Sequence, residues 1–261
     1  MELGLDGTVA VVTGGASTIG RAIAMALAAE GAVVAIFDRD GALADKTTAQ
    51  IHSGGGVATF HQVDLTDLDS TEAAVGIVED ELGPIRTLVN SVGWNGKAAA
   101  FLDLPPERWA ELHTRNIATT ANATRAVLRR MVERREGSIV SIASDAGFGA
   151  PGASAYGATK AGVMSFMRSI ASEYGPFGVR ANTVSMGLVI PETGDLGEHG
   201  GWRYDTGLNE EAVETIKATT PLRLLAEAND IASAVAFLAS HQARRLTGQI
   251  LSVSGGYCMP R

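Results

Sequence analysis

The sequence predicts an α/β fold: a single Rossmann-like domain over residues 1–261, with a doubly wound parallel sheet of about seven strands and helices on both faces. Short β-branched runs alternate with longer alanine-rich segments whose apolar residues recur at helical spacing. The first runs are almost entirely apolar, as expected of parallel strands buried on both faces. Glycine supplies 31 of the 261 residues, which indicates many sharp turns and close backbone contacts.

The first half of the chain alternates strands with helices. Thr8–Thr13 is an apolar β-branched run, and Gly31 ends the alanine-rich helix that follows it. The expected strands are Thr8–Thr13, Ala32–Phe37, Val57–Val63 and Thr87–Asn90, and the expected helices are Arg21–Glu30, Asp40–His52 and Asp69–Leu82. This alternation favours a parallel sheet, because parallel neighbours need crossover helices.

The second half continues the alternation with longer helices. The strands are expected at Ser138–Ala143, Val179–Val184 and Gln249–Val253, and the helices at Glu107–Arg134, Ala155–Tyr174 and Asn229–Ser240. Residues 188–215 break the rhythm, since Leu188 to Leu208 is rich in Gly, Pro, Glu and aromatic residues without a clear period. We expect a substrate loop here, beside the ligand crevice at the strand ends.

Charge and cysteine content exclude several classes of partner. The formal net charge of −8 and the pI of about 5.1 repel a phosphate backbone and anionic lipid, so we expect neither nucleic-acid nor membrane binding. The single cysteine, Cys258, allows no intrachain disulfide and no thiolate zinc cluster, and Asp195, Glu198 and His199 do not form a convincing metal set. Without a signal-like start, we expect a cytoplasmic protein.

A glycine-rich turn follows the first strand and opens the first helix. Its residues, Thr13 to Gly20, lie where a dinucleotide pyrophosphate can approach the backbone and the helix N-terminus. The alternative is a tight strand-to-helix connection that binds nothing. Asp38, 18 residues after Gly20, favours the first interpretation, because a carboxylate at the second strand end accepts ribose hydroxyls and repels a 2′-phosphate. NAD is therefore expected over NADP, although Asp38 could instead cap a helix and Arg39 leaves room for NADP.

A tyrosine and a lysine lie one helical turn apart, at Tyr156 and Lys160. The four-residue step places both side chains on one helix face, and an ammonium near a phenol lowers the pKa of the phenol toward a useful range. Such pairs also occur by chance, as an ordinary tyrosine and a surface lysine. The glycine turn and the strand-end Asp38 earlier in the chain favour a catalytic site.

From Leu5 to about Met259 the chain resembles the single-domain branch of the short-chain dehydrogenase/reductase family. The turn matches the Thr-Gly-x-x-x-Gly-x-Gly pattern of that family, except that Thr18 replaces the middle glycine. Asp64-Leu65 looks like its adenine-contacting pair, and Asn90 to Gly93 resembles its Asn-Asn-Ala-Gly segment. The cofactor contacts that the resemblance implies are Gly14, Ser17, Thr18, Ile19, Gly20, Asp38, Asp64, Leu65, Asn90, Gly93, Tyr156, Lys160 and Val189.

The same resemblance implies four catalytic residues. Tyr156 would be the general acid or base, Ser144 would bond the reacting oxygen, and Lys160 would lower the pKa of Tyr156 and grip the nicotinamide ribose. Asn116 would hold a water in a proton relay, the alternative being a solvent-facing or helix-kinking asparagine. Ser141 is the rival of Ser144, but it lies further back in the strand.

The expected function is hydride transfer between NAD and a partly apolar secondary alcohol or ketone. A cyclic alcohol or ketone is one form that this substrate could take. The alternatives are an NADP-dependent carbonyl or 3-oxoacyl-thioester reductase and a nucleotide-binding protein without catalysis. Expected pocket residues are Trp94, Phe148, Met186, Leu196, Trp202 and Tyr204. The apolar faces of the two long helices, Glu107–Arg134 and Ala155–Tyr174, favour a homotetramer or a homodimer.

Overall fold

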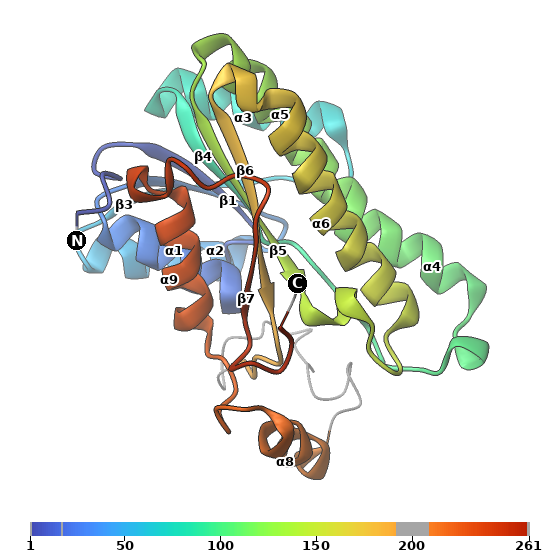
Figure 1. Cartoon of the computed structure of the whole chain (residues 1–261). Helices are drawn as coiled ribbons and strands as arrows, with labels where there is room; N and C mark the ends of the chain where they lie inside the picture. Colours follow the sequence, from blue (N-terminus) through green and yellow to red (C-terminus); the bar gives the residue numbers. More distant parts are fainter. Residues whose placement is uncertain (1, 17, 192–208, 260–261) are drawn as a thin grey trace.

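The computed structural model describes residues 2–16, 18–191 and 209–259, and within them seven parallel strands form one sheet. The strands are β1 (Val9–Thr13), β2 (Val33–Asp38), β3 (Val57–Gln62), β4 (Ile85–Asn90), β5 (Gly137–Ser144), β6 (Val179–Met186) and β7 (Ile250–Val253). Their order across the sheet is β3-β2-β1-β4-β5-β6-β7, and Figure 1 shows the sheet between two layers of helices. The predicted fold class is confirmed, and each predicted strand end lies within two residues of the observed one.

Helices cover both faces of the sheet because alternate strand residues point to opposite sides. From β1, Ala10 and Val12 pack into a core with α1 (Thr18–Ala29), α2 (Gly41–Ser53) and α9 (Ala228–Ala239). Val9 and Val11 pack into a second core with α3 (Leu68–Leu82), α5 (Thr119–Arg134) and α6 (Ser154–Tyr174). All five β1 residues are buried, which explains why its sequence is so uniformly apolar.

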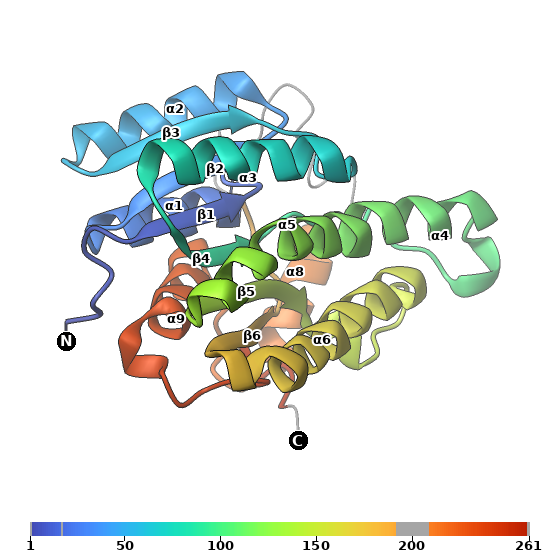
Figure 2. The ribbon, with the colours of Figure 1, turned by 90° about the horizontal axis from the view of Figure 1, so that it is seen from above.

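The long helical stretch expected over Glu107–Arg134 is not one continuous α-helix. It consists of α4 (Pro106–His113), a π-helical turn (Thr114–Ala118) and α5, which follow one another nearly in line beside α6 (Figure 2). Side chains hydrogen-bond to the backbone carbonyls of this turn: Thr119 Oγ1 donates to Arg115 O and Thr120 Oγ1 donates to Asn116 O. Such bonds compete with the regular helical ladder, and π turns recur at functional sites.

The predicted loop at residues 188–215 is wrong at its C-terminal end, because helix α8 (Glu210–Thr219) begins within it. Asn209 caps this helix by accepting a hydrogen bond from Ala212 N at 2.8 Å, and Glu210 and Glu211 occupy the first turn. An asparagine cap followed by acidic residues is a recognisable helix start. Residues 192–208 of the predicted loop lie outside the described part of the chain.

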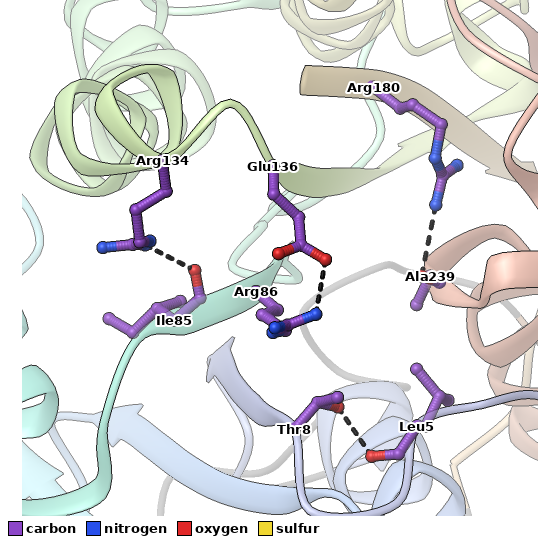
Figure 3. A network of polar contacts seen from close by, with 8 residues as sticks. All are labelled: Leu5, Thr8, Ile85, Arg86, Arg134, Glu136, Arg180 and Ala239. Carbon is purple, nitrogen blue, oxygen red and sulfur yellow. Dashed lines mark hydrogen bonds and ion pairs between the residues drawn. The ribbon is translucent and has the colours of Figure 1, made fainter. Parts of the chain in front are cut away.

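Several arginines hold the edge of the sheet at which the strands begin (Figure 3). Arg180 on β6 donates to the carbonyls of Leu238, Ala239 and Ser240 at the carboxyl end of α9, and to that of Leu246. Arg134 donates to Ile85 O at 3.0 Å, and Arg86 pairs with Glu136. Burial lowers the pKa of Arg180. Its guanidinium satisfies carbonyls that the end of a helix otherwise leaves without donors.

No helix among the described residues is long and apolar enough to span a bilayer.

We predict that Arg180→Met destabilises the protein by about 2–4 kcal/mol, because several carbonyls lose their donor at once. Arg86→Met is the matched control: its ion pair with Glu136 is about half exposed, and the expected loss is under about 1 kcal/mol. Urea unfolding of both variants measures the difference. Equal losses would contradict the role given to Arg180.

Candidate active site

A cleft of about 680 Å³ opens at the carboxyl ends of the strands. Its walls include the turn after β1, the ends of β2, β4, β5 and β6, the start of α6, and Ile216 of α8. The sequence-predicted residues that line it are Gly14, Thr18, Ile19, Gly20, Asp38, Asp64, Leu65, Gly93, Ser144, Tyr156, Lys160 and Val189. This is where open parallel sheets bind ligands, since the strand order reverses between β1 and β4.

The glycine turn brings backbone into contact with backbone. A Cβ on Gly20 would lie 2.0 Å from Gly14 O, so only glycine fits there. Gly14 has φ +64°, and its N–H donates to Phe37 O at the end of β2. The turn therefore presents bare backbone and the N-terminus of α1 to the cleft, which suits a pyrophosphate.

Thr18 occupies the position of the missing glycine with φ +48°. A β-branched residue rarely adopts this left-handed conformation, which carries a strain on the order of 1–3 kcal/mol. Thr18 thus keeps the backbone shape that glycine would provide, and it lines the cleft. Ser17, which the sequence also predicts as a cofactor contact, lies outside the described residues.

Asp38 is held by three backbone N–H groups. Its Oδ2 accepts from Ala16 N at 3.1 Å, and its Oδ1 accepts from Arg39 N and Asp40 N at 2.7 and 3.1 Å. The cap of α2 is Asp40, which accepts from Leu43 N, so Asp38 does not serve as the cap. A carboxylate can accept about four hydrogen bonds, which leaves capacity for a ligand hydroxyl at the cleft wall.

The pair Asp64-Leu65 lies beside the end of β3. Asp64 is exposed and accepts hydrogen bonds from the hydroxyl and the N–H of Thr66, which lower the pKa of its carboxyl group. Leu65 is buried, and its carbonyl accepts a hydrogen bond from Asn122 Nδ2. The two residues offer a charged and an apolar group to the same end of the cleft as Asp38.

Asn90 does not line the cleft. It is 2% exposed, and its Nδ2 donates to Thr124 Oγ1 and Ser141 Oγ, which joins β4 to α5 and β5. Ser141 is fully buried by this contact and by Met167 Sδ at 3.1 Å. Of the two candidate serines, only Ser144 reaches the cleft.

Lys160 is buried, and within the described part of the chain its Nζ donates one hydrogen bond, to Ile142 O of β5 at 3.1 Å. A Cβ on Gly93 would lie 2.7 Å from this Nζ, so the absence of a side chain at Gly93 leaves the space that the ammonium fills. Burial lowers the pKa of Lys160 from 10.5 to about 8. Lys160 therefore ties α6 to the centre of the sheet while it faces the cleft.

Tyr156 lies beside Ser144 and Lys160 at this end of the cleft. Burial raises the pKa of Tyr156 to about 12, and a hydrogen bond with Ser144 acts in the opposite direction. The Lys160 Nζ is 5.8 Å from the centroid of the Tyr156 ring. Loss of hydration outweighs the Ser144 hydrogen bond, and the expectation that Lys160 lowers the pKa of Tyr156 stays a prediction.

Two glycines bring Tyr156 close to the serine. A Cβ on Gly157 would lie 2.5 Å from Ala146 O, and one on Gly147 would lie 3.0 Å from Ala161 N. The start of α6 therefore packs directly on the 3₁₀ turn Asp145–Phe148 that follows Ser144. Neither glycine is among the predicted site residues, and only Gly157 carries a signal in the sequence, as a glycine inside a helical pattern.

Asn116 lies in the π-helical turn and is fully buried. Its side chain exchanges two 2.8 Å hydrogen bonds with the backbone of Trp94 and donates a third to Leu112 O. These bonds fix the chain that follows β4 and carries Gly93. Asn116 does not line the cleft, so its role in a water relay stays a prediction.

The predicted substrate pocket is present only in part. Trp94 and Met186 line the cleft, whereas Phe148 does not line it and is 41% exposed. Leu196, Trp202 and Tyr204, and the residues Asp195, Glu198 and His199 discussed as metal ligands, lie outside the described residues. Within residues 2–16, 18–191 and 209–259, no group of three His, Cys, Asp or Glu side chains is arranged to hold a metal.

The chain is similar to known proteins over nearly its whole length. A family model described as enoyl-(acyl carrier protein) reductase matches residues 14–258. The 3-oxoacyl-[acyl-carrier-protein] reductase of Vibrio cholerae is 35% identical over 98% of this chain and 100% of its own.

Two solved structures share the fold over nearly their whole length. One, an NAD⁺-bound xylitol dehydrogenase, has a TM-score of 0.89 at 29% identity, covering 97% of this chain and 99% of its own. The other, described as a putative NAD(P)-dependent gluconate 5-dehydrogenase from Beutenbergia cavernae with bound NADP at low occupancy, has a TM-score of 0.87 at 31% identity, covering 98% of this chain and 99% of its own.

We predict that Lys160→Met raises the free energy of unfolding at pH 7 by about 1–2 kcal/mol. The lowered pKa means that the buried ammonium destabilises the folded state at neutral pH, by about 1.4 kcal/mol per unit, and the lost bond to Ile142 O offsets part of the gain. Between pH 8 and 10.5 the unfolded chain holds a proton that the folded wild type has released, so the wild type gains stability on the variant.

Denaturant unfolding of both proteins from pH 7 to pH 10 checks this. The advantage of Lys160→Met should vanish toward pH 10. A variant that is less stable at every pH, by a constant amount, would contradict the assignment.

Proposed function

This chain belongs to the short-chain dehydrogenase/reductase family of NAD(P)-dependent oxidoreductases, and we propose that it is an NAD-dependent dehydrogenase of secondary alcohols. The observation that carries the proposal is the convergence of Ser144, Tyr156 and Lys160 on one end of a cleft whose other end presents the glycine turn and Asp38. The first group supports proton transfer, and the second suits a dinucleotide.

The described residues fit a dinucleotide. Gly14, Ile19 and Gly20 would hold the pyrophosphate, Asp38 the adenosine ribose, and Asp64 and Leu65 the adenine. Lys160 would hold the nicotinamide ribose, and the backbone at Val189 the carboxamide. The bound nicotinamide would accept or return the hydride and, when oxidised, would bring a positive charge into the cleft.

Tyr156 would transfer the hydroxyl proton of the substrate. With a pKa of about 12 the phenol keeps its proton in the structure described here, which is the form that protonates the oxygen of a ketone. In alcohol oxidation it must release that proton first, and positive charge nearby lowers its pKa. Ser144 would hold the reacting oxygen, and Lys160 would supply part of the positive charge.

The substrate proposed is a partly apolar secondary alcohol or the corresponding ketone. Trp94 and Met186 give the cleft apolar surface, while Asn95 and Ser144 add polar groups. The names of the two solved relatives indicate polyol and sugar-acid substrates, which carry secondary hydroxyls. We further propose that the enzyme acts in the cytoplasm as a homotetramer or a homodimer that pairs through α5 and α6.

An NADP-dependent reductase of 3-oxoacyl thioesters is the second candidate. Arg39 is exposed and lines the cleft next to Asp38, where a guanidinium could bind a 2′-phosphate. The 3-oxoacyl-[acyl-carrier-protein] reductase relative supports this candidate as well. The choice between the two depends on whether the charge of Asp38 or that of Arg39 dominates.

We predict that Tyr156→Phe lowers kcat/KM about 10³-fold while NADH affinity stays within about twofold, because only the transferable proton is lost. Tyr174→Phe, at the far end of α6, is the matched control and should retain wild-type turnover. Rates with a panel of secondary alcohols, followed by NADH absorbance, measure both. Activity of Tyr156→Phe within tenfold of wild type would remove Tyr156 from the mechanism.

We predict that wild-type protein binds NADH at least about tenfold more tightly than NADPH, because Asp38 repels a 2′-phosphate. Asp38→Asn should lose most of that preference while keeping the size of the side chain. Fluorescence titration with both dinucleotides gives the affinities. Tighter NADPH binding by the wild type would favour the second candidate.

A further inference from the structure

A buried carboxylate that the proposed mechanism does not use lies directly after Ser144. Asp145 is 5% exposed and lines the cleft at the end of β5. The carboxyl ends of β6 and β7 lie beside it, since Ser185 pairs with Ala143 on one side and with Ser252 on the other. Asp145 is thus surrounded by the ends of three strands.

Serine hydroxyls surround this carboxylate. Ser185 Oγ donates to Oδ1 at 2.5 Å, and Ser252 Oγ lies 3.1 and 3.2 Å from the two oxygens. Ser252 Oγ is also 2.9 Å from Ser254 Oγ, which accepts from Cys258 N at 3.4 Å. The Ser185 hydroxyl therefore donates to Asp145, and the Ser252 hydroxyl has two kinds of acceptor within reach, the Asp145 carboxylate and, at 3.3 Å, Cys258 O.

None of the ion pairs among the described residues includes Asp145. Asp145 acts electrostatically on Cys258: burial raises the pKa of the Cys258 thiol, and the charge of Asp145 raises it further. A buried charge that only hydroxyls solvate acts strongly over short distances, because little water screens it.

The charged groups of the cleft fall into separate sets. Asp38, Arg39 and Asp64 lie at the ends of β2 and β3, and Arg115 lies in the π-helical turn. Asp145 and Lys160 lie at the end of β5, where Lys160 bonds Ile142 O. This is the end that holds Tyr156, so a nicotinamide bound for hydride transfer would lie near Asp145.

We infer that Asp145 makes the cleft bind the oxidised nicotinamide cofactor in preference to the reduced one. The oxidised ring carries a positive charge and the reduced ring is neutral, so a fixed negative charge nearby favours only the first. The enzyme would load NAD⁺ readily and release NADH readily, which suits turnover in the direction of alcohol oxidation. This inference rests on the proposed function.

The test compares affinities rather than activity. Isothermal titration gives the Kd of NAD⁺ and of NADH for wild type, Asp145→Asn and Ser252→Ala. In Asp145→Asn we expect the Kd of NAD⁺ to rise about tenfold and that of NADH to change less than about twofold. A tenfold change in this ratio raises the reduction potential of the bound cofactor by about 30 mV.

Ser252→Ala is the matched control, because it removes a hydroxyl from the carboxylate but leaves the charge. Its ratio of the two Kd values should stay within about twofold of wild type. Equal weakening of both forms by Asp145→Asn would give Asp145 a structural role alone and overturn the inference. Wild-type protein that binds no nicotinamide dinucleotide would instead overturn the proposed function, and this inference with it.

A second variant and two further measurements guard against a variant that does not fold. Asp145→Ser also removes the charge and is smaller, and thermal melting shows whether each variant is folded. For wild type alone, we compare NAD⁺ with a dinucleotide that carries uncharged benzamide in place of nicotinamide. Equal affinity for these two ligands overturns the inference, and at least about fivefold tighter binding of NAD⁺ supports it.

Discussion

The buried ammonium of Lys160 organises the carboxyl edge of the sheet. It reaches from α6 to the Ile142 carbonyl of β5 and fills the space that Gly93 leaves after β4. Burying a cation with one hydrogen bond is unfavourable, and the lowered pKa of Lys160 expresses that penalty. The surrounding packing holds the ammonium in place, and with it the helix turn that carries Tyr156.

The two edges of the sheet differ in how their polar groups are satisfied. Where the strands begin, arginine side chains bind carbonyl groups, as Arg180 does at the end of α9 (Figure 3). Where the strands end, polar groups are buried with few partners and backbone segments approach closely at Gly20 and Gly157. The arginine–carbonyl bonds at the first edge stabilise the fold and offset the free-energy cost of the buried charge and strained backbone at the second edge.

Burial also sets the chemistry of the cleft. It raises the pKa of Tyr156 and lowers that of Lys160, so each group moves toward its uncharged form. Any charge that enters such a site has a large effect, because the groups already there are poorly hydrated. A cationic ligand ring favours loss of the phenol proton, and Asp145 favours the presence of that ring.

The sequence by itself determined the fold class, the positions of the strands and the order of the site residues. Strands buried on both faces must be apolar throughout, and crossover helices must separate parallel neighbours, so these features are written in local patterns. Only the tertiary structure decided which polar groups meet. In the folded chain Ser141 accepts a hydrogen bond from Asn90, whereas Ser144 lines the cleft. The side chain of Asn116 accepts a hydrogen bond from the backbone N–H of Trp94. It also joined Asp145 to Ser185 and Ser252, which are 40 and 107 residues away in sequence. Such contacts depend on how separate strands align side by side, and no local pattern encodes that alignment.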